Sequence, residues 1–309
     1  MHSLSILIKN KAKELGFDAC GIAEVASADT EVLFFDRWIA EGCHAGMKYM
    51  ENYRDIRLNP AGLVEGARSV ISVALNYYPA QKQSPDSPRI SYYAYGKDYH
   101  IVVKDKLRQL WEYITSLVPV LDSTLPVARF FTDSAPILER YWAWKAGLGW
   151  IGKNTNLIIP GKGSFFFLGE IVTTLELDYD TPQKNRCGTC RRCLDSCPTG
   201  ALERPGHLNA NKCISYLTIE HKGDIPSEQA SRLGDRLYGC DTCQEVCPWN
   251  RFASPTREVA FSPSPAFLSL KKEDLRCFTR DDYNRIFAGS AVKRAKYEGL
   301  IRTINNKKE

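Results

Sequence analysis

The spacing of the cysteines between residues 187 and 247 constrains this chain more than any other feature of its sequence. Eight of its eleven cysteines lie there. The first four read Cys187-x2-Cys190-x2-Cys193-x3-Cys197, and Pro198 follows. Bacterial ferredoxins use this run to hold [4Fe–4S] clusters, because a tight loop can direct three thiolates at one cluster while the fourth cysteine, before the proline, binds the other cluster. The run therefore predicts a ferredoxin-like module with two clusters.

A second, shorter run supplies the remaining ligands. It reads Cys240-x2-Cys243-x3-Cys247 and is again followed by proline. Alignment of the two runs places Leu237 where a first cysteine would stand, and Cys213 is the only nearby thiol that can replace it. With the crossed pairing of bacterial ferredoxins, we predict that each cluster takes ligands from both runs. The first cluster is assigned to Cys187, Cys190, Cys193 and Cys247, and the second to Cys197, Cys213, Cys240 and Cys243.

Other uses of so many cysteines fit the sequence less well. A pair of structural zinc sites would also take four cysteines each, but zinc motifs do not require this run before a proline. A disulfide framework is not expected, because residues 4–15 have the pattern of an amphipathic helix and not of a signal peptide. We therefore expect a cytoplasmic protein with reduced thiols and no membrane span. The outlying Cys20, Cys43 and Cys277 are expected to be small buried apolar side chains.

The part of the chain before the cysteines alternates between helical and strand patterns. Apolar and β-branched residues predict buried strands at 69–77 and 165–177, and apolar residues at helical spacing predict a helix at 104–118. Gly169 suggests a β-bulge in the second of these strands. Residues 1–178 are therefore expected to form a mixed α/β, or α+β, domain.

The remaining residues are assigned to two further parts. A polar, linker-like segment begins at residue 178 and leads into the cysteines, so we predict that the ferredoxin-like domain spans 179–252. Helical spacing predicts two short helices at 281–287 and 291–304. These belong to a C-terminal helical extension over 253–309, which we expect to pack back on the core.

Asp133 stands where a predicted buried strand runs into a helix. One interpretation is that its carboxylate caps the helix N-terminus. The other is that it is a general acid at a strand-to-helix junction, where ligands gather in α/β folds. The glycine-rich segment 147–154 that follows does not fit the dinucleotide fingerprint, and the sequence contains no Walker motif and no H-E-x-x-H motif.

Five segments together resemble the epoxyqueuosine reductase family, and the resemblance extends over about residues 5–300. The segments are YGKDYH (95–100), DSAPILER (133–140), KAGLGWIGKN (145–154), CISYLT (213–218) and YGCDTCQEVCP (238–248). The resemblance implies an N-terminal domain that binds cobalamin, two [4Fe–4S] clusters and a tRNA substrate. The implied reaction removes the epoxide oxygen of epoxyqueuosine at the wobble position of the anticodon loop and yields queuosine.

The resemblance also implies roles for individual residues. Asp133 would donate a proton to the opening epoxide beside the cobalamin, which favours the second interpretation of this residue. Ser215 would lie between the clusters and the cobalamin, and Lys222 would contact the tRNA. Further cobalamin contacts are expected at Arg57, Ser91, Lys153, Asn154 and Asn156. The basic residues of the C-terminal segment could bind phosphates or could simply be solvated, and they are Lys293, Arg294, Lys296, Arg302, Lys307 and Lys308.

Two other functions stay open at this point. The chain could be a corrinoid reductase of a small molecule, similar to reductive dehalogenases, or a ferredoxin-type electron carrier without a substrate of its own. Binding of tRNA would distinguish an epoxyqueuosine reductase from both of these functions. Binding of cobalamin would distinguish either enzyme from the electron carrier. We expect a monomer that receives electrons from a donor such as a flavodoxin or a ferredoxin.

Overall fold

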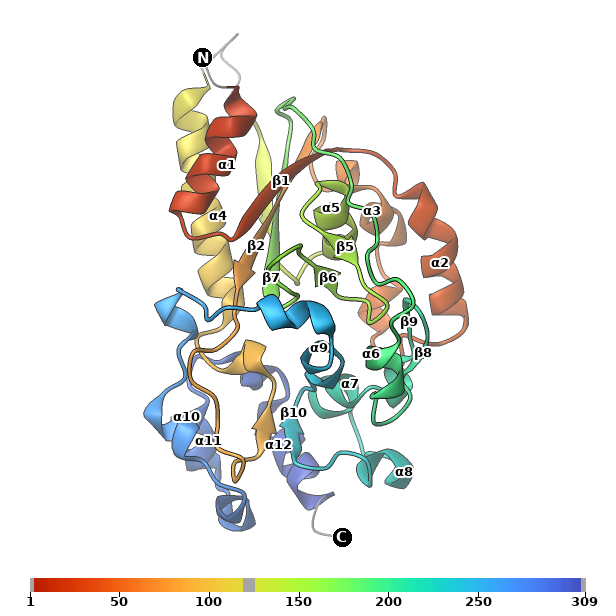
Figure 1. The fold of residues 1–309 in the computed structure, drawn as a ribbon, viewed down its shortest axis with the longest axis vertical. Coiled ribbons are helices and arrows are strands. Elements are labelled where there is room, and N and C mark those ends of the chain that lie inside the picture. The colour runs from red at the N-terminus through yellow and green to blue at the C-terminus, as the bar shows by residue number, and fades with distance from the viewer. Residues whose placement is uncertain (1–2, 119–125, 307–309) are drawn as a thin grey trace.

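A four-stranded antiparallel sheet forms the centre of the protein, with strand order β1-β2-β7-β4 (Figure 1). The computed structural model describes residues 3–118 and 126–306. The strands of the sheet are β1 (Ala19–Glu24), β2 (Ser69–Asn76), β4 (Ala128–Phe131) and β7 (Phe166–Thr173). The two middle strands, β2 and β7, are buried almost throughout. Their continuous apolar patterns follow from this position, because both faces of the sheet are covered.

Helices cover the sheet on both faces and create two apolar cores (Figure 1). On one face lie α1 (Leu4–Glu14) and α4 (Tyr99–Leu117), and on the other lie α2 (Asp29–Ala40), α3 (Arg54–Leu58) and α5 (Glu139–Lys145). The α4 side chains that recur at helical spacing, Val103, Leu107, Leu110 and Ile114, are fully buried. Within the described ranges, no helix combines the length and the apolarity that a membrane span requires.

The cysteine-rich region consists of short elements below the sheet in Figure 1. Its helices are α6 (Arg192–Asp195), α7 (Ile214–Ile219), α8 (Ser227–Ala230) and α9 (Thr242–Glu245), and its strands are β8 (Leu202–Arg204), β9 (His207–Leu208) and β10 (Arg236–Tyr238). Strand β10 pairs in parallel with β3 (Arg89–Ile90) from the first part of the chain. A small hairpin of β5 (Trp150–Ile151) and β6 (Leu157–Ile158) lies between the sheet and this region (Figure 1).

The C-terminal helices share one apolar core with both earlier parts of the chain. These helices are α10 (Pro265–Ser269), α11 (Arg280–Ile286) and α12 (Lys296–Asn305). Their buried side chains pack with Ile90 and Tyr95 and with Leu237 and Tyr238. The extension therefore packs back on the rest of the protein, while the three domain boundaries stay predictions.

Most predicted elements form, with two informative differences. Helix α4 begins at Tyr99 and not at residue 104, because the side chain of Asp98 accepts a hydrogen bond from the His100 N–H and caps the helix. The bulge predicted at Gly169 is wrong, since β2 and β7 pair in unbroken register and Gly169 lies opposite Val73. A Cβ atom at Gly169 would lie 2.8 Å from Cγ1 of Val103, so glycine is required there because helix α4 packs closely on the strand.

Candidate functional site

The eight cysteines of residues 187–247 fall into two groups in space. Electrostatic interactions join Cys247 to Cys187 and Cys190, and join Cys193 to both Cys247 and Cys187. The second set of interactions joins the thiols of Cys197, Cys213, Cys240 and Cys243. Helices α6 and α9, which follow the two cysteine runs, pack against each other. The fold thus brings together the thiols of each set assigned from the sequence.

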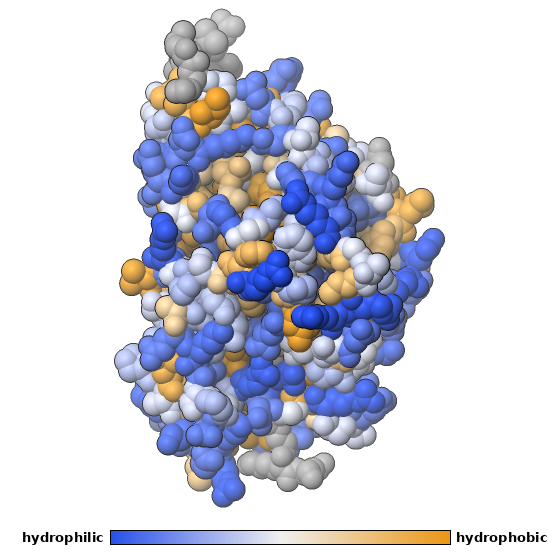
Figure 2. All heavy atoms as spheres, in the orientation of Figure 1, coloured by the Kyte–Doolittle hydropathy of each residue, from blue (hydrophilic) through white to orange (hydrophobic). Residues whose placement is uncertain are grey.

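The two groups lie at different depths. Burial raises the pKa of the Cys213 thiol to about 11 and holds that of Cys243 well above its usual range. The other group follows residues 184–186, which are exposed, and strongly hydrophilic side chains gather over the region of α6 in the space-filling view (Figure 2). The group that contains Cys187 is therefore the outer one.

The loop of the β5–β6 hairpin holds the cysteine loops in place. The Lys153 ammonium donates to the carbonyl oxygens of Gly188, at 2.6 Å, and Cys190, at 2.9 Å. The Asn154 amide donates to the carbonyl of Cys243, at 3.2 Å, and Asn156 Nδ2 lies 4.0 Å from the Cys243 sulfur. These residues thus contact the two cysteine loops, and their contact with a cobalamin stays a prediction.

Asp133 follows β4 in a left-handed backbone conformation, with φ of 58°. Its Oδ2 atom accepts a hydrogen bond of 2.5 Å from the Tyr99 hydroxyl and lies 3.5 Å from His100 Nε2. Its backbone N–H donates to the Glu139 carboxylate. Helix α5 begins only at Glu139, with Leu138 as its N-cap, so the hypothesis that Asp133 caps this helix is wrong.

Asp133 and His100 form an ion pair at neutral pH. Burial alone would raise the pKa of Asp133, but the hydrogen bonds from His100 and Tyr99 hold it below the usual value. Hydrogen bonds to Asp133 and to Asp98, whose Oδ1 lies 2.7 Å from His100 Nδ1, raise the pKa of His100 to about 9. A carboxylate beside an imidazolium stores one proton next to the space that Asp133 faces.

Two further carboxyl groups lie behind Asp133. Burial, followed by the charge of Asp133, raises the pKa of Glu139 to about 8. Burial also holds the pKa of Glu170, a fully buried residue in the middle of β7, well above its usual range, and the interaction with Glu139 adds to this. Two adjacent buried carboxyl groups cannot both ionise at neutral pH, so this pair retains at least one proton.

Asp133 is open to water on one side. Its side chain is 61% exposed, and Tyr49 and Arg294 are among its electrostatic neighbours. Tyr49 interacts electrostatically with Asp133 and with Glu220 and Arg294. Arg294 donates two hydrogen bonds of 2.8 Å to the Glu220 carboxylate. The sequence did not indicate that Tyr49, Glu220 and Arg294 belong to this site, because they come from three distant segments.

Arg57 belongs to the same neighbourhood and has spare hydrogen-bonding capacity. Its Nη2 atom donates to the carbonyl of Tyr49, at 3.1 Å, and its charge influences Tyr49 together with Asp133. The residue is 7% exposed, and among the described residues its buried Nε–H finds no acceptor. A buried N–H without a partner fits a polar group of a ligand.

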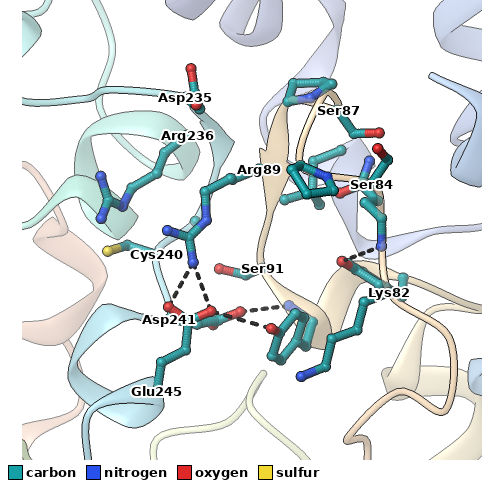
Figure 3. Close-up of a pocket in the computed structure, with 17 residues that line it drawn as sticks. Lys82, Ser84, Ser87, Arg89, Ser91, Asp235, Arg236, Cys240, Asp241 and Glu245 are labelled. Carbon is teal, nitrogen blue, oxygen red and sulfur yellow. Dashed lines mark hydrogen bonds and ion pairs between the residues drawn. The ribbon is translucent and has the colours of Figure 1, made fainter. Parts of the chain in front are cut away.

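Ser91 lines a separate polar pocket of about 360 Å³ beside the inner thiol group (Figure 3). In this pocket Arg89 forms an ion pair of 2.6 Å with Glu245, and the Asp241 carboxylate accepts the Tyr92 N–H at 2.8 Å. Burial raises the pKa of Asp241 to about 6. Ser91 is thus beside Cys240, which is a neighbour that the prediction of a cobalamin contact did not include.

The remaining predicted residues lie near α7 and the C-terminus. Ser215 is in the first turn of α7, two residues after Cys213, and Lys222 is exposed in the loop after this helix. Lys293 and Lys296 are exposed, whereas Arg302 donates to the carbonyl of Leu217 at 2.7 Å and joins α12 to α7. Lys307 and Lys308 lie outside the described residues.

Two family models match the chain. The model of a 4Fe-4S double cluster binding domain covers residues 186–250, and the model of Epoxyqueuosine reductase QueG covers residues 57–134. The first range contains all eight cysteines of the two groups. The prediction of iron–sulfur clusters is confirmed, whereas the assignment of each ligand stays a prediction.

Proteins named epoxyqueuosine reductase match nearly the whole chain. One from Cellulophaga algicola is 47% identical over 301 residues, which are 97% of this chain and 97% of the relative. A crystal structure of epoxyqueuosine reductase with a tRNA-Tyr epoxyqueuosine-modified stem loop has a TM-score of 0.86 at 30% identity, and covers 98% of this chain and 80% of that chain. A structure of epoxyqueuosine reductase from Bacillus subtilis has a TM-score of 0.85, with the same identity and coverage. In that structure the catalytic loop, which contains an aspartate, is swung out of the active site.

A catabolic reductive dehalogenase is similar to a much smaller degree. Its TM-score is 0.51 at 17% identity, and the match covers 96% of this chain and 37% of the dehalogenase. This likeness shows a common fold and carries no statement about function.

The crossed grouping of the thiols predicts the outcome of one substitution. Cys247→Ser should damage the cluster of Cys187, Cys190 and Cys193, although Cys247 belongs to the other run, because it completes that group in space. Iron analysis and EPR of the reduced variant should show loss centred on one cluster. Cys277 is exposed and lies outside both groups, so the expectation that it is buried is wrong, and Cys277→Ser should leave both signals intact. Loss of the cluster of Cys240 and Cys243 alone would contradict the pairing.

Proposed function

This chain belongs to the epoxyqueuosine reductase family, and from this premise we propose that it reduces epoxyqueuosine to queuosine at the wobble position of tRNA, using cobalamin and two [4Fe–4S] clusters. The activity is that of an oxidoreductase. The observation that carries the proposal is the exposed carboxylate of Asp133, held by Tyr99 and His100, in a protein that also contains two groups of four thiols.

The two alternative functions are not favoured. The relative that matches 97% of the chain is named for the tRNA-modifying reductase, whereas the likeness to a dehalogenase extends to the fold alone. Electron transfer alone does not require proton-transferring groups. Here an ionised aspartate, a charged histidine and two buried carboxyl groups are neighbours.

The residues around Asp133 fit a cobalamin. Arg57 offers a buried N–H without a partner, which could bind a polar side group of the corrinoid. Ser215 is close in sequence to Cys213 of the inner thiol group and could lie between this cluster and the cofactor. When bound, cobalamin supplies a centre that can accept electrons one at a time and pass them to the substrate. The other predicted cobalamin contacts would influence the cofactor at longer range, through the cysteine loops that they contact. They are Lys153, Asn154, Asn156 and Ser91.

The protein's own part in the reaction is the supply of protons. Loss of an epoxide oxygen as water, with formation of a double bond, consumes a pair of electrons and a pair of protons. Asp133 is ionised at rest, so it transfers a proton only after receiving one from a neighbour, and the His100 imidazolium lies 3.5 Å away. The Glu139–Glu170 pair behind Asp133 retains another proton in the dry interior. We assign to Asp133 the transfer of the proton to the departing oxygen.

Asp133→Asn tests this role. The amide keeps the shape and can still accept the Tyr99 hydrogen bond, but it cannot carry a transferable proton. We expect intact folding, cluster content and cobalamin binding, with turnover lowered by roughly 10²- to 10⁴-fold, the usual contribution of a general acid. Asp105→Asn, an exposed aspartate of α4, is the matched control and should keep normal turnover. Near-normal turnover of the Asp133 variant would remove Asp133 from the mechanism.

The pH profile provides a second measurement on the same site. Since the pKa of His100 is raised to about 9, the stored proton is present below that pH and lost above it. The kcat/KM of the wild type, which reports on the free enzyme, should therefore fall as the pH rises through about 9. His100→Gln should abolish this alkaline limb, and a limb that persists unchanged would assign it to another group.

The surroundings of the outer thiol group favour an acidic electron donor. Exposed cationic side chains near this group form what we call the basic collar, which consists of Lys184, Arg186, Arg191, Arg192 and Arg251. Among the described residues, Arg191 of the basic collar forms an ion pair of 3.5 Å with the carboxylate of Asp195. We propose that the electron donor is a flavodoxin or a ferredoxin with an acidic surface. We also propose that the protein described here acts as a cytoplasmic monomer. Cluster reduction by an acidic flavodoxin should slow as salt increases, whereas a rate independent of salt would contradict this docking.

The tRNA would bind through phosphate contacts, with a base displaced from the loop toward Asp133. Exposed Lys222, Lys293 and Lys296 are the candidates for the phosphates, whereas Arg294 is already held by Glu220. Charge reversal of Lys293 and Lys296 should weaken tRNA binding and make the slope of log affinity against log salt less negative by about 1.4, if each lysine contacts one phosphate. The measurement is affinity for the tRNA at several salt concentrations.

The control for this experiment is a pair of lysines at the opposite end of the molecule. Charge reversal of Lys11 and Lys13 in α1, which lies at the end remote from the C-terminus in Figure 1, should leave the slope unchanged. Cluster and cobalamin spectra should be normal in both double variants. Binding that does not depend on salt in the wild type would contradict phosphate recognition by this surface.

A further inference from the structure

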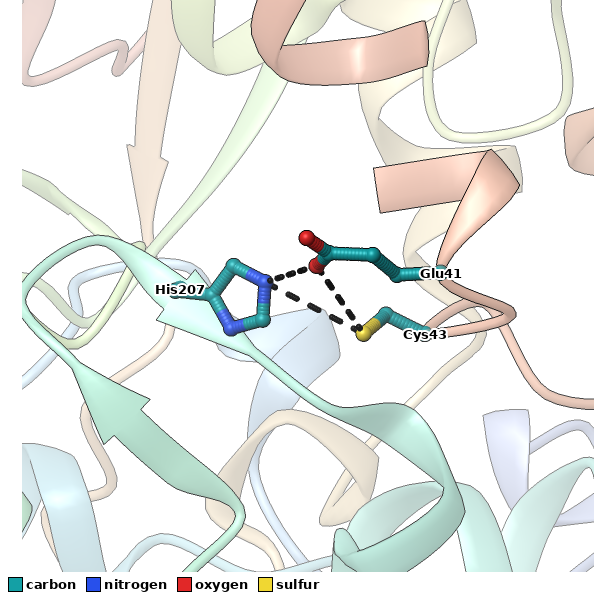
Figure 4. Close-up of side chains that lie close together, drawn as sticks. All are labelled: Glu41, Cys43 and His207. Carbon is teal, nitrogen blue, oxygen red and sulfur yellow. Dashed lines mark hydrogen bonds and ion pairs between the residues drawn. The ribbon is translucent and has the colours of Figure 1, made fainter. Parts of the chain in front are cut away.

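Three potential metal ligands meet at a place remote in sequence from the cluster cysteines (Figure 4). Glu41 and Cys43 lie in the turn that follows α2, and His207 lies in β9. His207 Nε2 is 3.0 Å from Glu41 Oε2 and 3.9 Å from the Cys43 sulfur, and the same sulfur is 3.9 Å from Glu41 Oε2. The three atoms form a small triangle, and the three side chains converge on one point.

The triangle has the dimensions of a metal site. Tetrahedral zinc, with bonds of about 2.3 Å to sulfur and about 2.0–2.1 Å to nitrogen and oxygen, separates its ligand atoms by about 3.3–3.6 Å. Each observed separation lies within about 0.4 Å of that range, so small rotations of the side chains would suffice. A thiolate, an imidazole and a carboxylate are together a donor set that suits zinc.

The burial of the site also suits a bound cation. Cys43 and His207 are 4% and 3% exposed, whereas the Glu41 side chain is 40% exposed and leaves one side open to water. The other ring nitrogen of His207, Nδ1, has no hydrogen-bond partner among the described residues, but Glu203 Oε2 lies 3.6 Å from it. Histidines that bind metals usually direct their second N–H to a carboxylate, which fixes the tautomer, and a shift of a few tenths of an ångström would bring Glu203 into that role.

We propose that Glu41, Cys43 and His207 bind one zinc ion, with water as the fourth ligand. On binding, the Cys43 thiol loses its proton, and the neutral imidazole of His207 binds through Nε2 and keeps its proton on Nδ1 beside Glu203. Arg204, whose Nη2 lies 3.9 Å from the same Glu41 oxygen, is 56% exposed and free to move toward solvent. This inference is independent of the proposed function, since it uses none of the residues around Asp133.

The position of the site indicates a structural role. Hydrogen bonds already join this turn to the cysteine-rich region, from Ala210 N–H to the Cys43 carbonyl at 2.8 Å and from the Trp38 indole to the Leu208 carbonyl at 2.7 Å. A zinc ion on Cys43 and His207 would strengthen this joint a few residues before Cys213 of the inner thiol group. It would hold that part of the cluster region against α2.

X-ray absorption at the zinc edge tests the proposal on the wild-type holoenzyme, reconstituted to full iron content and loaded with one equivalent of zinc. The expected spectrum has one sulfur at about 2.3 Å and otherwise nitrogen or oxygen neighbours. Zinc that had entered a cluster site would show three or four sulfurs. Such a spectrum, or zinc that does not remain bound after desalting, would overturn the proposal without reliance on any variant.

A matched pair of variants tests the residues. Cys43→Ala should weaken zinc binding at least about 100-fold, since loss of even an outer partner of a ligand costs 10- to 100-fold. Cys277→Ala, an exposed cysteine, should bind zinc as the wild type does. Both should retain full iron content and cluster spectra. Equal zinc affinity in the Cys43 variant and the wild type would overturn the assignment of this ligand.

Discussion

The grouping of eight thiols into two sets, each with members from both ends of the segment 187–247, determines how several other segments must be arranged. It requires helices α6 and α9 to pack together, and the chain between them must leave this contact and return. The return strand, β10, pairs with β3 of the first part of the chain, and the C-terminal helices complete one core around both. The cysteine-rich region is therefore built into the protein and is not an appended carrier.

The catalytic part of the proposal depends on a balance between burial and charge. Burial alone would raise the pKa of Asp133, but Tyr99 and His100 donate to its carboxylate and hold the pKa below the usual value. Helix α4 carries both donors in its first turn, and its buried side chains anchor it in the core. Packing of this helix therefore holds the two donors beside Asp133. Glu139 holds the strained backbone of Asp133 from the other side. In the proposed reaction, protons from this site and electrons from the clusters reach the same substrate through different parts of the fold.

Contacts between distant segments hold the cysteine-rich region against the first part of the chain. The Lys153 ammonium binds carbonyls of the outer cysteine loop, and Asn154 binds a carbonyl of the inner one. The Tyr216 hydroxyl of α7 accepts the Gly46 N–H, close to the turn of Cys43. Electron transfer requires fixed distances, and each of these contacts restricts movement between the sheet and the clusters. The zinc site that we infer would be one more contact of this kind.

Features that depend on short-range patterns can be predicted from the order of the amino acids alone. The spacing of cysteines predicted the two sets of thiols, and apolar periodicity predicted β2, β7 and most of α4, because ligand loops, strands and helices repeat over a few residues. The resemblance of five segments to a known family, and not any pattern of residues, indicated the cobalamin and the role of Asp133. The interpretation of Asp133 as a helix cap arises because a strand followed by apolar residues at helical spacing has that appearance.

Contacts between residues that are distant along the chain become visible once the chain has folded. Tyr99 is 34 positions from Asp133, and Cys43 is 164 positions from His207, so no local pattern relates the members of either pair. The need for glycine at position 169 likewise comes from the approach of Val103 on another element. Shifts in pKa depend on burial and on neighbouring charges, which exist only after the chain has folded. For this reason the sequence predicted the elements and the cysteine ligands, whereas the proton chemistry and the Glu41–Cys43–His207 site required the three-dimensional fold.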